Sequence, residues 1–204
     1  TLQVAKELER ITGMSCGLHH VGGITLADNQ ARFEMLVAER AKHRYMGLHT
    51  EIMTPKEIAD RTDGLVNVEG IVGGLYDPLD GHLDPSGTTH AYAKAARMGG
   101  AEIVLHNRVL ETNPRADGGW DVVTEQGTIH AEHVVNAGGL WAREVGAMAG
   151  VYLPLLPMAH QYLVTDDIPE IMAILATGRE FPHVMDPGGE SYLRQEGRGL
   201  CIGF

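Results

Sequence analysis

The sequence has little positive charge and no long apolar run. Of its 204 residues, 16 are Lys or Arg and 27 are Asp or Glu, which leaves a formal net charge of −11. An acidic surface repels phosphate backbones, and no basic cluster offsets it, so nucleic-acid binding is disfavoured. Nowhere do about 18 apolar residues follow one another, so we expect no membrane span. With 44% hydrophobic residues, the chain can still form a folded core.

Cysteine is also scarce, because Cys16 and Cys201 are the only two and lie far apart. This spacing is typical of free thiols in a reducing compartment and not of a disulfide framework. The first seven residues carry charges where a signal peptide would be apolar. We therefore expect bacterial cytoplasm or mitochondrial matrix. Because the chain starts without Met and stops within a predicted strand, we expect an internal fragment of a longer protein.

The histidines do not form a convincing metal site. His19 and His20 are adjacent, and His130 and His133 are three residues apart, all on predicted strands. Residues at these spacings point to opposite faces of a strand, so neither pair chelates a metal easily. The sequence also lacks a G-x-S-x-G motif and a cationic setting for either cysteine, so acyl-transfer chemistry has no support.

Local signals in the first half predict a mixed α/β fold. A capping box at residues 54–57 begins a short helix. Asp84 caps an alanine-rich helix over residues 85–99, and apolar stretches at residues 70–76 and 101–106 flank this helix. Strand, helix and strand in this order predict a βαβ unit, which favours a parallel sheet.

The second half is richer in predicted strands. Turn residues between three apolar segments predict an antiparallel meander. Its strands are expected at residues 108–112, 120–124 and 128–135, and further strands at residues 158–165, 191–194 and 200–203. The stretch between residues 165 and 191 is expected to be irregular.

A glycine-rich turn follows the third strand of this meander. Asn136-Ala137-Gly138-Gly139 leads into a helix that begins with Leu140-Trp141. Free backbone amides at such a turn lie at the positive end of the helix dipole and suit a phosphate. The dinucleotide fingerprint G-x-G-x-x-G is missing, since Gly197-Arg198-Gly199 continues without the third glycine or a helix. A complete dinucleotide fold is therefore not encoded in these residues.

Polar side chains on two predicted strands form the remaining candidate site. Strand alternation places His160 and Tyr162 on one face and gives Tyr192 and Arg194 a common face. By themselves, these residues favour a simpler interpretation, in which they are half-buried polar positions of an ordinary sheet.

Four ordered motifs, however, resemble those of dimethylglycine dehydrogenase and its sarcosine dehydrogenase relatives, which are D-amino-acid-oxidase-like flavoproteins. The resemblance extends from about Gly17 almost to the end of the chain. The motifs are Gly74-Leu75-Tyr76-Asp77-Pro78 with residues 80–85, residues 134–146, His160-Gln161-Tyr162-Leu163-Val164-Thr165, and Ser191-Tyr192-Leu193-Arg194-Gln195-Glu196.

The resemblance implies part of a two-domain flavoprotein. Residues 17–76 and 151–204 would belong to an antiparallel-sheet substrate domain, the second part being truncated. Residues 77–150 would be the middle of an FAD-binding domain with a partial Rossmann-like βαβ unit and a β-meander. The nucleotide fingerprint and the histidine that bonds covalently to the flavin would precede residue 1. Residues 1–204 alone would therefore not bind FAD tightly. A folate-binding region would follow residue 204.

The resemblance also implies roles for individual residues. His160 and Tyr192 match the active-site His and Tyr, while Tyr162 and Arg194 would bind substrate. The residues expected beside FAD are Val109, Asn136, Ala137, Gly138, Gly139, Leu140 and Trp141.

The implied reaction is oxidation of the N-methyl group of dimethylglycine or sarcosine by hydride transfer to FAD. Its expected partners are a small N-methylated amino acid and, as oxidant, oxygen or an electron-transfer flavoprotein. Tetrahydrofolate is a further expected cofactor. Two alternatives remain: an oxidase of another secondary or tertiary amine, and a non-catalytic regulatory or binding subunit of the same fold.

Overall fold

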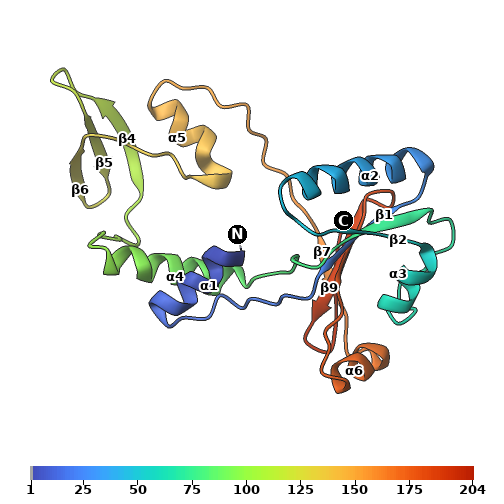
Figure 1. Cartoon of the computed structure of the whole chain (residues 1–204). Helices are drawn as coiled ribbons and strands as arrows, with labels where there is room; N and C mark the ends of the chain where they lie inside the picture. Colours follow the sequence, from blue (N-terminus) through green and yellow to red (C-terminus); the bar gives the residue numbers. More distant parts are fainter. Residues whose placement is uncertain (1) are drawn as a thin grey trace. The chain divides into compact units, whose positions relative to one another are not determined.

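The computed structural model describes residues 2–204. The chain forms two compact units, one made of residues 2–99 and 160–204 and the other of residues 100–159 (Figure 1). No helix in the described residues is both long enough and apolar enough to cross a membrane.

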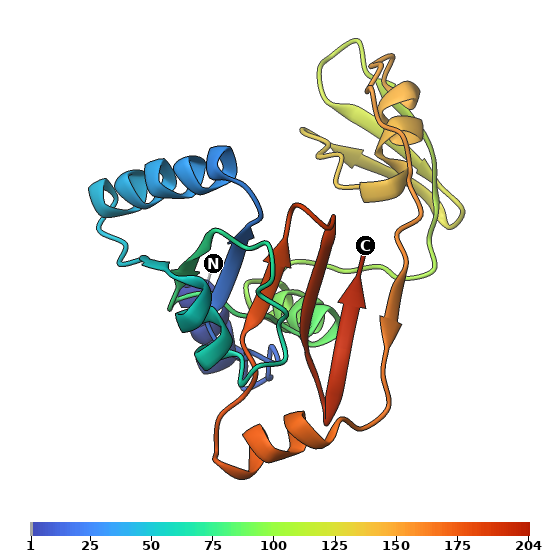
Figure 2. The ribbon, with the colours of Figure 1, turned by 90° about the vertical axis from the view of Figure 1, so that its right-hand side faces the viewer.

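The larger unit contains a seven-stranded sheet with the order β2-β3-β1-β8-β9-β10-β7 (Figure 2). Strands β1 and β8 run parallel, and the other neighbouring pairs are antiparallel. The strands are β1 (Gly23–Ala27), β2 (Glu51–Met53), β3 (Gly73–Asp77), β7 (Tyr162–Val164), β8 (His183–Asp186), β9 (Ser191–Glu196) and β10 (Gly199–Gly203).

One face of this sheet forms the main hydrophobic core. Strand alternation directs Ile24, Val184 and Leu200 to this face, where helices α3 (Pro55–Arg61) and α6 (Pro169–Ala176) pack on them. The largest side chains buried there are Phe181, Ile24, Ile58, Ile171 and Val184. Because these residues hold the sheet from one side, the alternating positions on the other face are available for a site.

Helix α2 (Gln30–Tyr45) packs at the β1–β3 end of that second face. Leu36 of the helix is buried against Ala27 and Leu75 of the strands. Asn29 begins the helix by accepting a hydrogen bond from the Arg32 amide. Positions farther along the same face, on β9, β10 and β7, line a hollow described below.

Two further helices of this unit pack on each other. They are α1 (Leu2–Thr12) and α4 (Pro85–Met98), which bury Ala5, Leu8 and Ala91 together with Cys16. Asp84 caps α4 by accepting from the amides of Ser86 and Gly87, as its position before Pro85 predicts. The capping box at Thr54 and Glu57 is also present. These predicted helix starts are confirmed.

The smaller unit contains the predicted antiparallel meander. Its strands are β4 (Val109–Pro114), β5 (Trp120–Thr124) and β6 (Gly127–Ala131), followed by a short 3-10 helix η1 (Gly139–Trp141) and helix α5 (Ala142–Met148). The mixed α/β class is therefore confirmed, as are the meander and the turn that leads into a helix.

The predicted βαβ unit is incomplete, because residues 101–106 form no strand. Val104 and Leu105 are largely exposed there, and His106 has a φ of 54°, which is incompatible with continued strand geometry. Helix α4 therefore does not connect parallel strands. Instead, the preceding strand β3 pairs antiparallel with β1 and β2.

Several predicted strand bounds also needed correction. Strand β6 ends at Ala131, not residue 135, because its partner β5 begins at the opposite residue, Trp120. Strand β7 begins at Tyr162, not residue 158, because β10 ends at Gly203 across from it. His160 thus precedes the strand on which the sequence placed it. The stretch predicted to be irregular contains α6 and β8.

Candidate functional site

The face of the large sheet opposite its main core carries two rows of aligned residues. In one row, Tyr192 of β9 and Tyr162 of β7 both lie opposite Gly203 of β10. In the neighbouring row, Arg194 and Val164 both lie opposite Cys201. Because alternate residues of a strand share a face, the two rows form one continuous surface.

Tyr192 leans across Gly203 in the first row. A Cβ atom on Gly203 would fall against the Cζ, Cε1 and Oη atoms of the Tyr192 ring. On its other side, Tyr192 meets the His183 ring edge to face, with ring centroids 6.1 Å apart and planes at 82°. This geometry is favourable for aromatic pairs. The phenol is therefore directed over β10.

Three of the predicted site residues line one hollow of about 530 Å³ in this surface. These are Tyr162, Tyr192 and Arg194, which come from strands that are distant in sequence. The full lining is Pro85, Tyr162, Val164, Tyr192, Arg194, Glu196 and Cys201. The hollow therefore combines the Arg194–Glu196 ion pair and two phenols with apolar walls. The guanidinium of this pair suits a small molecule bearing a carboxylate.

Arg194 has donors left for a ligand. Its Nη1 atom lies 2.6 Å from Oε2 of Glu196 and donates to the Gln195 carbonyl oxygen at 3.1 Å. Within residues 2–204, the structure records no partner for Nη2 or Nε. Because the guanidinium is planar, one edge can remain with Glu196 while the other edge binds a carboxylate.

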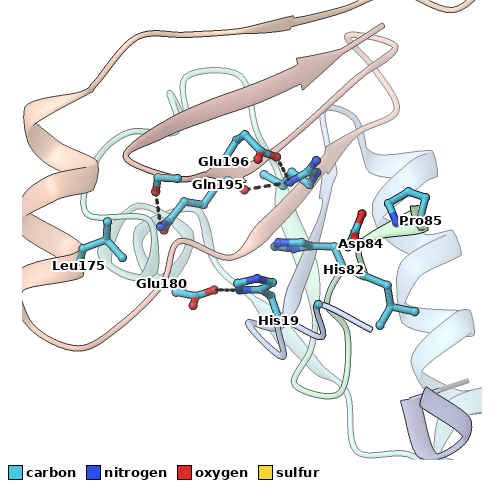
Figure 3. A pocket seen from close by; sticks show the side chains of 12 residues that line it. His19, His82, Asp84, Pro85, Leu175, Glu180, Gln195 and Glu196 are labelled. Carbon is cyan, nitrogen blue, oxygen red and sulfur yellow. Dashed lines mark hydrogen bonds and ion pairs between the residues drawn. The ribbon is translucent and has the colours of Figure 1, made fainter. Parts of the chain in front are cut away.

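Arg194 also lines a second hollow of about 530 Å³ (Figure 3). Here the rings of His19 and His82 stack with centroids 4.8 Å apart, and Nδ1 of His19 lies 2.8 Å from Oε2 of Glu180. The His82 Nδ1 atom is buried without a hydrogen-bond partner among the described residues. Burial lowers the pKa of His82, and the nearby positive charge of Arg194 lowers it further.

The carboxylate of Asp80 lies close to His183. Gly23 of β1 is paired with His183, and a Cβ on this glycine would collide with the carboxylate of Asp80. Oδ2 of Asp80 is 3.8 Å from Nδ1 of His183. This His183 neighbour is the main reason that the pKa of Asp80 is lowered, and the hydrogen bond from the Gly81 amide contributes further.

His160 is placed differently from the other predicted site residues. Its side chain is exposed on the segment before β7, where Nδ1 lies 3.4 Å from the Phe204 carbonyl oxygen. It is not among the residues that line either hollow. The structure therefore groups Tyr162, Tyr192 and Arg194, but does not bring His160 into their hollow.

The predicted FAD residues lie in the smaller unit. The Asn136 side chain accepts from the Gly138 amide at 3.1 Å and donates to the Ala142 carbonyl oxygen at 2.8 Å, which fixes the turn. Gly139 has a φ of 52°, and a Cβ atom added at this position would have no other atom within 4 Å. The remaining predicted residues are Val109, at the start of β4, and Ala137, Leu140 and Trp141, next to or within the turn.

This turn can accommodate part of a dinucleotide. The first residues of a helix leave backbone amides without helical partners, and the exposed position of Gly139 allows a ligand to approach them. Leu140 and Trp141 are 54% and 66% exposed, so they offer apolar contact area. The turn thus fits a supporting contact to FAD, although the G-x-G-x-x-G fingerprint is missing from the sequence.

Sequence reasoning missed His183, Asp80 and the His19–His82 stack as site residues. His183 lies on β8, which was predicted to be irregular, and Asp80 lies in a loop. The dipeptide Phe181-Pro182 before an alternating segment could have indicated β8. No local signal would have paired these residues, because residues 80 and 183 are brought together by sheet topology.

The histidines form no metal cluster. No group of three or more His, Cys, Asp or Glu side chains in residues 2–204 is arranged to hold a metal ion.

The fold described here is that of the FAD-dependent oxidoreductases. A family model for the FAD dependent oxidoreductases (DAO) matches residues 1–204, and the chain belongs to this family. The chain is 40% identical to mitochondrial dimethylglycine dehydrogenase from Mus musculus over 203 residues, which is 100% of this chain. It is 34% identical to mitochondrial sarcosine dehydrogenase from Mus musculus over 98% of the chain.

Solved structures support the same fold. The structure of L-proline dehydrogenase from P. horikoshii matches 99% of this chain and 52% of that protein, with a TM-score of 0.81 and 25% sequence identity. The chain spans 23% of the length of the mouse dimethylglycine dehydrogenase and 21% of the sarcosine dehydrogenase.

Proposed function

We propose that the protein oxidises an N-methyl group of dimethylglycine or sarcosine. The observation that carries this proposal is the hollow lined by Tyr162, Tyr192 and Arg194. It combines a cation for a carboxylate with apolar and aromatic walls for methyl groups. The 40% identity to a dimethylglycine dehydrogenase supports this choice of substrate over other amines. FAD, when bound, supplies the hydride acceptor.

The substrate carboxylate is bound by Arg194 and Tyr192. Arg194 uses the guanidinium edge that faces away from Glu196, and the Tyr192 hydroxyl donates a hydrogen bond. Charge-assisted hydrogen bonds of this kind contribute about 1.5–3 kcal/mol each. Holding the carboxylate fixes the position of the methylated nitrogen relative to the rest of the hollow. Tyr162 and Val164 provide contacts for the methyl groups.

The substrate amine must be neutral when it reacts. A protonated amine has no lone pair with which to expel hydride, whereas a neutral amine forms an iminium ion as the C–H bond breaks. Either water then adds to this ion, releasing formaldehyde and the demethylated amine, or tetrahydrofolate takes up the one-carbon unit. Apolar walls favour the neutral amine through desolvation. We assign the proton acceptor to His160, and the support for this role is the motif it shares with Tyr162. For this role the exposed imidazole must turn from the Phe204 carbonyl oxygen toward the hollow.

The smaller unit supplies contacts to FAD in this proposal. Val109 and residues 136–141 are the proposed contact residues, with the amides of the turn placed near a phosphate. Residues 77–150 are accordingly proposed to belong to an FAD-binding domain, and residues 17–76 and 151–204 to a substrate domain.

The family resemblance supports the remaining details. We propose oxygen or an electron-transfer flavoprotein as the final electron acceptor and tetrahydrofolate as an acceptor of the one-carbon unit. The relatives named above are mitochondrial, which supports a mitochondrial location over the bacterial cytoplasm.

The test is anaerobic reduction of the purified full-length natural protein. We expect a yellow protein whose visible absorbance bleaches on addition of dimethylglycine or sarcosine, the faster of the two being the better substrate. Glycine betaine is the matched control, because its quaternary nitrogen has no lone pair and cannot undergo the reaction. A flavin that neither methylated glycine reduces would overturn the proposal and favour the non-catalytic subunit or an oxidase of a different amine.

A further inference from the structure

We propose that His183 is a positioning residue, held by Asp80, which aims the Tyr192 hydroxyl across Gly203 into the substrate hollow. This inference rests on the proposed function, because it assigns Tyr192 to substrate binding. His183 itself is not among the residues that line the hollow, so it acts through Tyr192.

The contact between His183 and Tyr192 sets the direction of the phenol. Their rings meet edge to face at a centroid distance of 6.1 Å. Tyr192 is 38% exposed, so other packing leaves its ring free to rotate toward solvent. The imidazole blocks the β8 side of the ring, while Gly203 leaves space on the β10 side. Together they favour the rotamer that extends over β10.

Asp80 lies within ion-pair distance of His183. Its carboxylate lies over Gly23, which is paired with His183, and Oδ2 is 3.8 Å from Nδ1 of the imidazole. Any side chain at position 23 would occupy the space of this carboxylate. The His183 side chain is only 21% exposed, so its ring is confined between this carboxylate and Tyr192.

The arrangement is therefore a row of contacts across the sheet. A carboxylate over one glycine holds an imidazole, and the imidazole holds a phenol over a second glycine. Both glycines have ordinary negative-φ backbones, because neither is among the positive-φ residues. Glycine is needed at both positions because a side chain would collide with a neighbouring group, and not because the backbone is unusual. Gly23 leaves space for the Asp80 carboxylate, and Gly203 leaves space for the Tyr192 ring.

The test compares His183→Ala with His183→Phe in the full-length protein. Glycine betaine binding is measured through its effect on the flavin spectrum, and dimethylglycine turnover gives kcat and KM. An aromatic pair of this kind corresponds to about a three- to tenfold change in an equilibrium constant. We expect His183→Ala to weaken betaine binding and raise KM by about that factor, with a smaller change in kcat.

His183→Phe should restore most of the affinity, because phenylalanine keeps the ring against Tyr192. Asp80→Asn should weaken betaine binding about two- to threefold, because it removes the negative charge beside the imidazole and leaves the His183 ring in place. The matched control is His90→Ala, which removes an exposed imidazole from α4 and should change nothing.

Three results would overturn the inference. They are a His183→Ala protein that is less stable but binds betaine normally, a His183→Phe protein that is as impaired as His183→Ala, and an Asp80→Asn protein indistinguishable from wild type. Failure of the proposed function is seen separately, because the wild-type flavin would then not be reduced by dimethylglycine. If wild type is reduced and the variants match it, only the role of His183 fails.

Discussion

A single methyl group at position 203 is expected to displace Tyr192. In Gly203→Ala, the new Cβ would fall within the Tyr192 ring, so the ring must move. The Gly203 backbone is extended and tolerates alanine, which by itself would stabilise the fold by about 0.4–1 kcal/mol. Overpacking costs about 1–3 kcal/mol, and the half-exposed ring has room to turn, which favours the lower end. The two effects nearly cancel in the free energy of unfolding.

Ligand affinity should change much more than stability. A displaced Tyr192 loses its hydrogen bond to the ligand carboxylate, and a charge-assisted bond contributes about 1.5–3 kcal/mol. Betaine affinity should therefore fall about tenfold or more in Gly203→Ala, while the thermal unfolding midpoint shifts by only a few degrees. Titration of the flavin spectrum and thermal unfolding of the same protein samples measure the two effects.

A double-mutant cycle isolates the cause. In a Tyr192→Ala background there is no ring to displace, so Gly203→Ala should not weaken betaine binding further, and should stabilise the protein slightly. The reasoning is refuted if Gly203→Ala lowers the affinity equally in both backgrounds, since the methyl group would then act on something other than Tyr192.

Three further predictions concern the core, the guanidinium and the buried imidazole. Phe181→Ala should lower the free energy of unfolding by about 3–5 kcal/mol in urea titrations, because the Phe181 side chain is fully buried; a loss below 1 kcal/mol would contradict this core assignment. Arg194→Gln should raise KM for dimethylglycine at least tenfold with a smaller effect on kcat, and an unchanged KM would remove Arg194 from carboxylate binding. The pKa of His82 is lowered below 6.5 in the fold, so its contribution to stability is full above pH 6.5 and is lost as pH falls through the folded value. Unfolding midpoints should therefore show a smaller loss between pH 7 and 5 in His82→Gln than in wild type, and equal losses would contradict the assignment.

The parts of the fold that local chemistry determines could be predicted from the sequence. Thr54 and Asp84 cap their helices because the hydroxyl and carboxylate bond to amides two or three residues away. The meander was predictable because short turns connect neighbouring strands. Residues 101–106 misled the prediction because an apolar segment becomes a strand only where a partner strand is available, and none pairs with it in the described residues.

The candidate site was predictable only in part. Alternation along β9 correctly placed Tyr192 and Arg194 on one face, since that pattern depends on a single strand. The same reasoning did not hold for His160, because β7 begins two residues later. The contacts of His183 with Asp80 and Tyr192 join three separate segments. Without the pairing of β8 between β1 and β9, nothing in the sequence connects them.

The most direct test of the central claim is a crystal structure of the full-length protein with glycine betaine bound. We predict that the ligand carboxylate lies within about 3 Å of both the Arg194 guanidinium and the Tyr192 hydroxyl. We also predict that its methyl groups face Tyr162 and Val164. A carboxylate bound elsewhere, with Arg194 paired only to Glu196 and Gln195, would contradict the account.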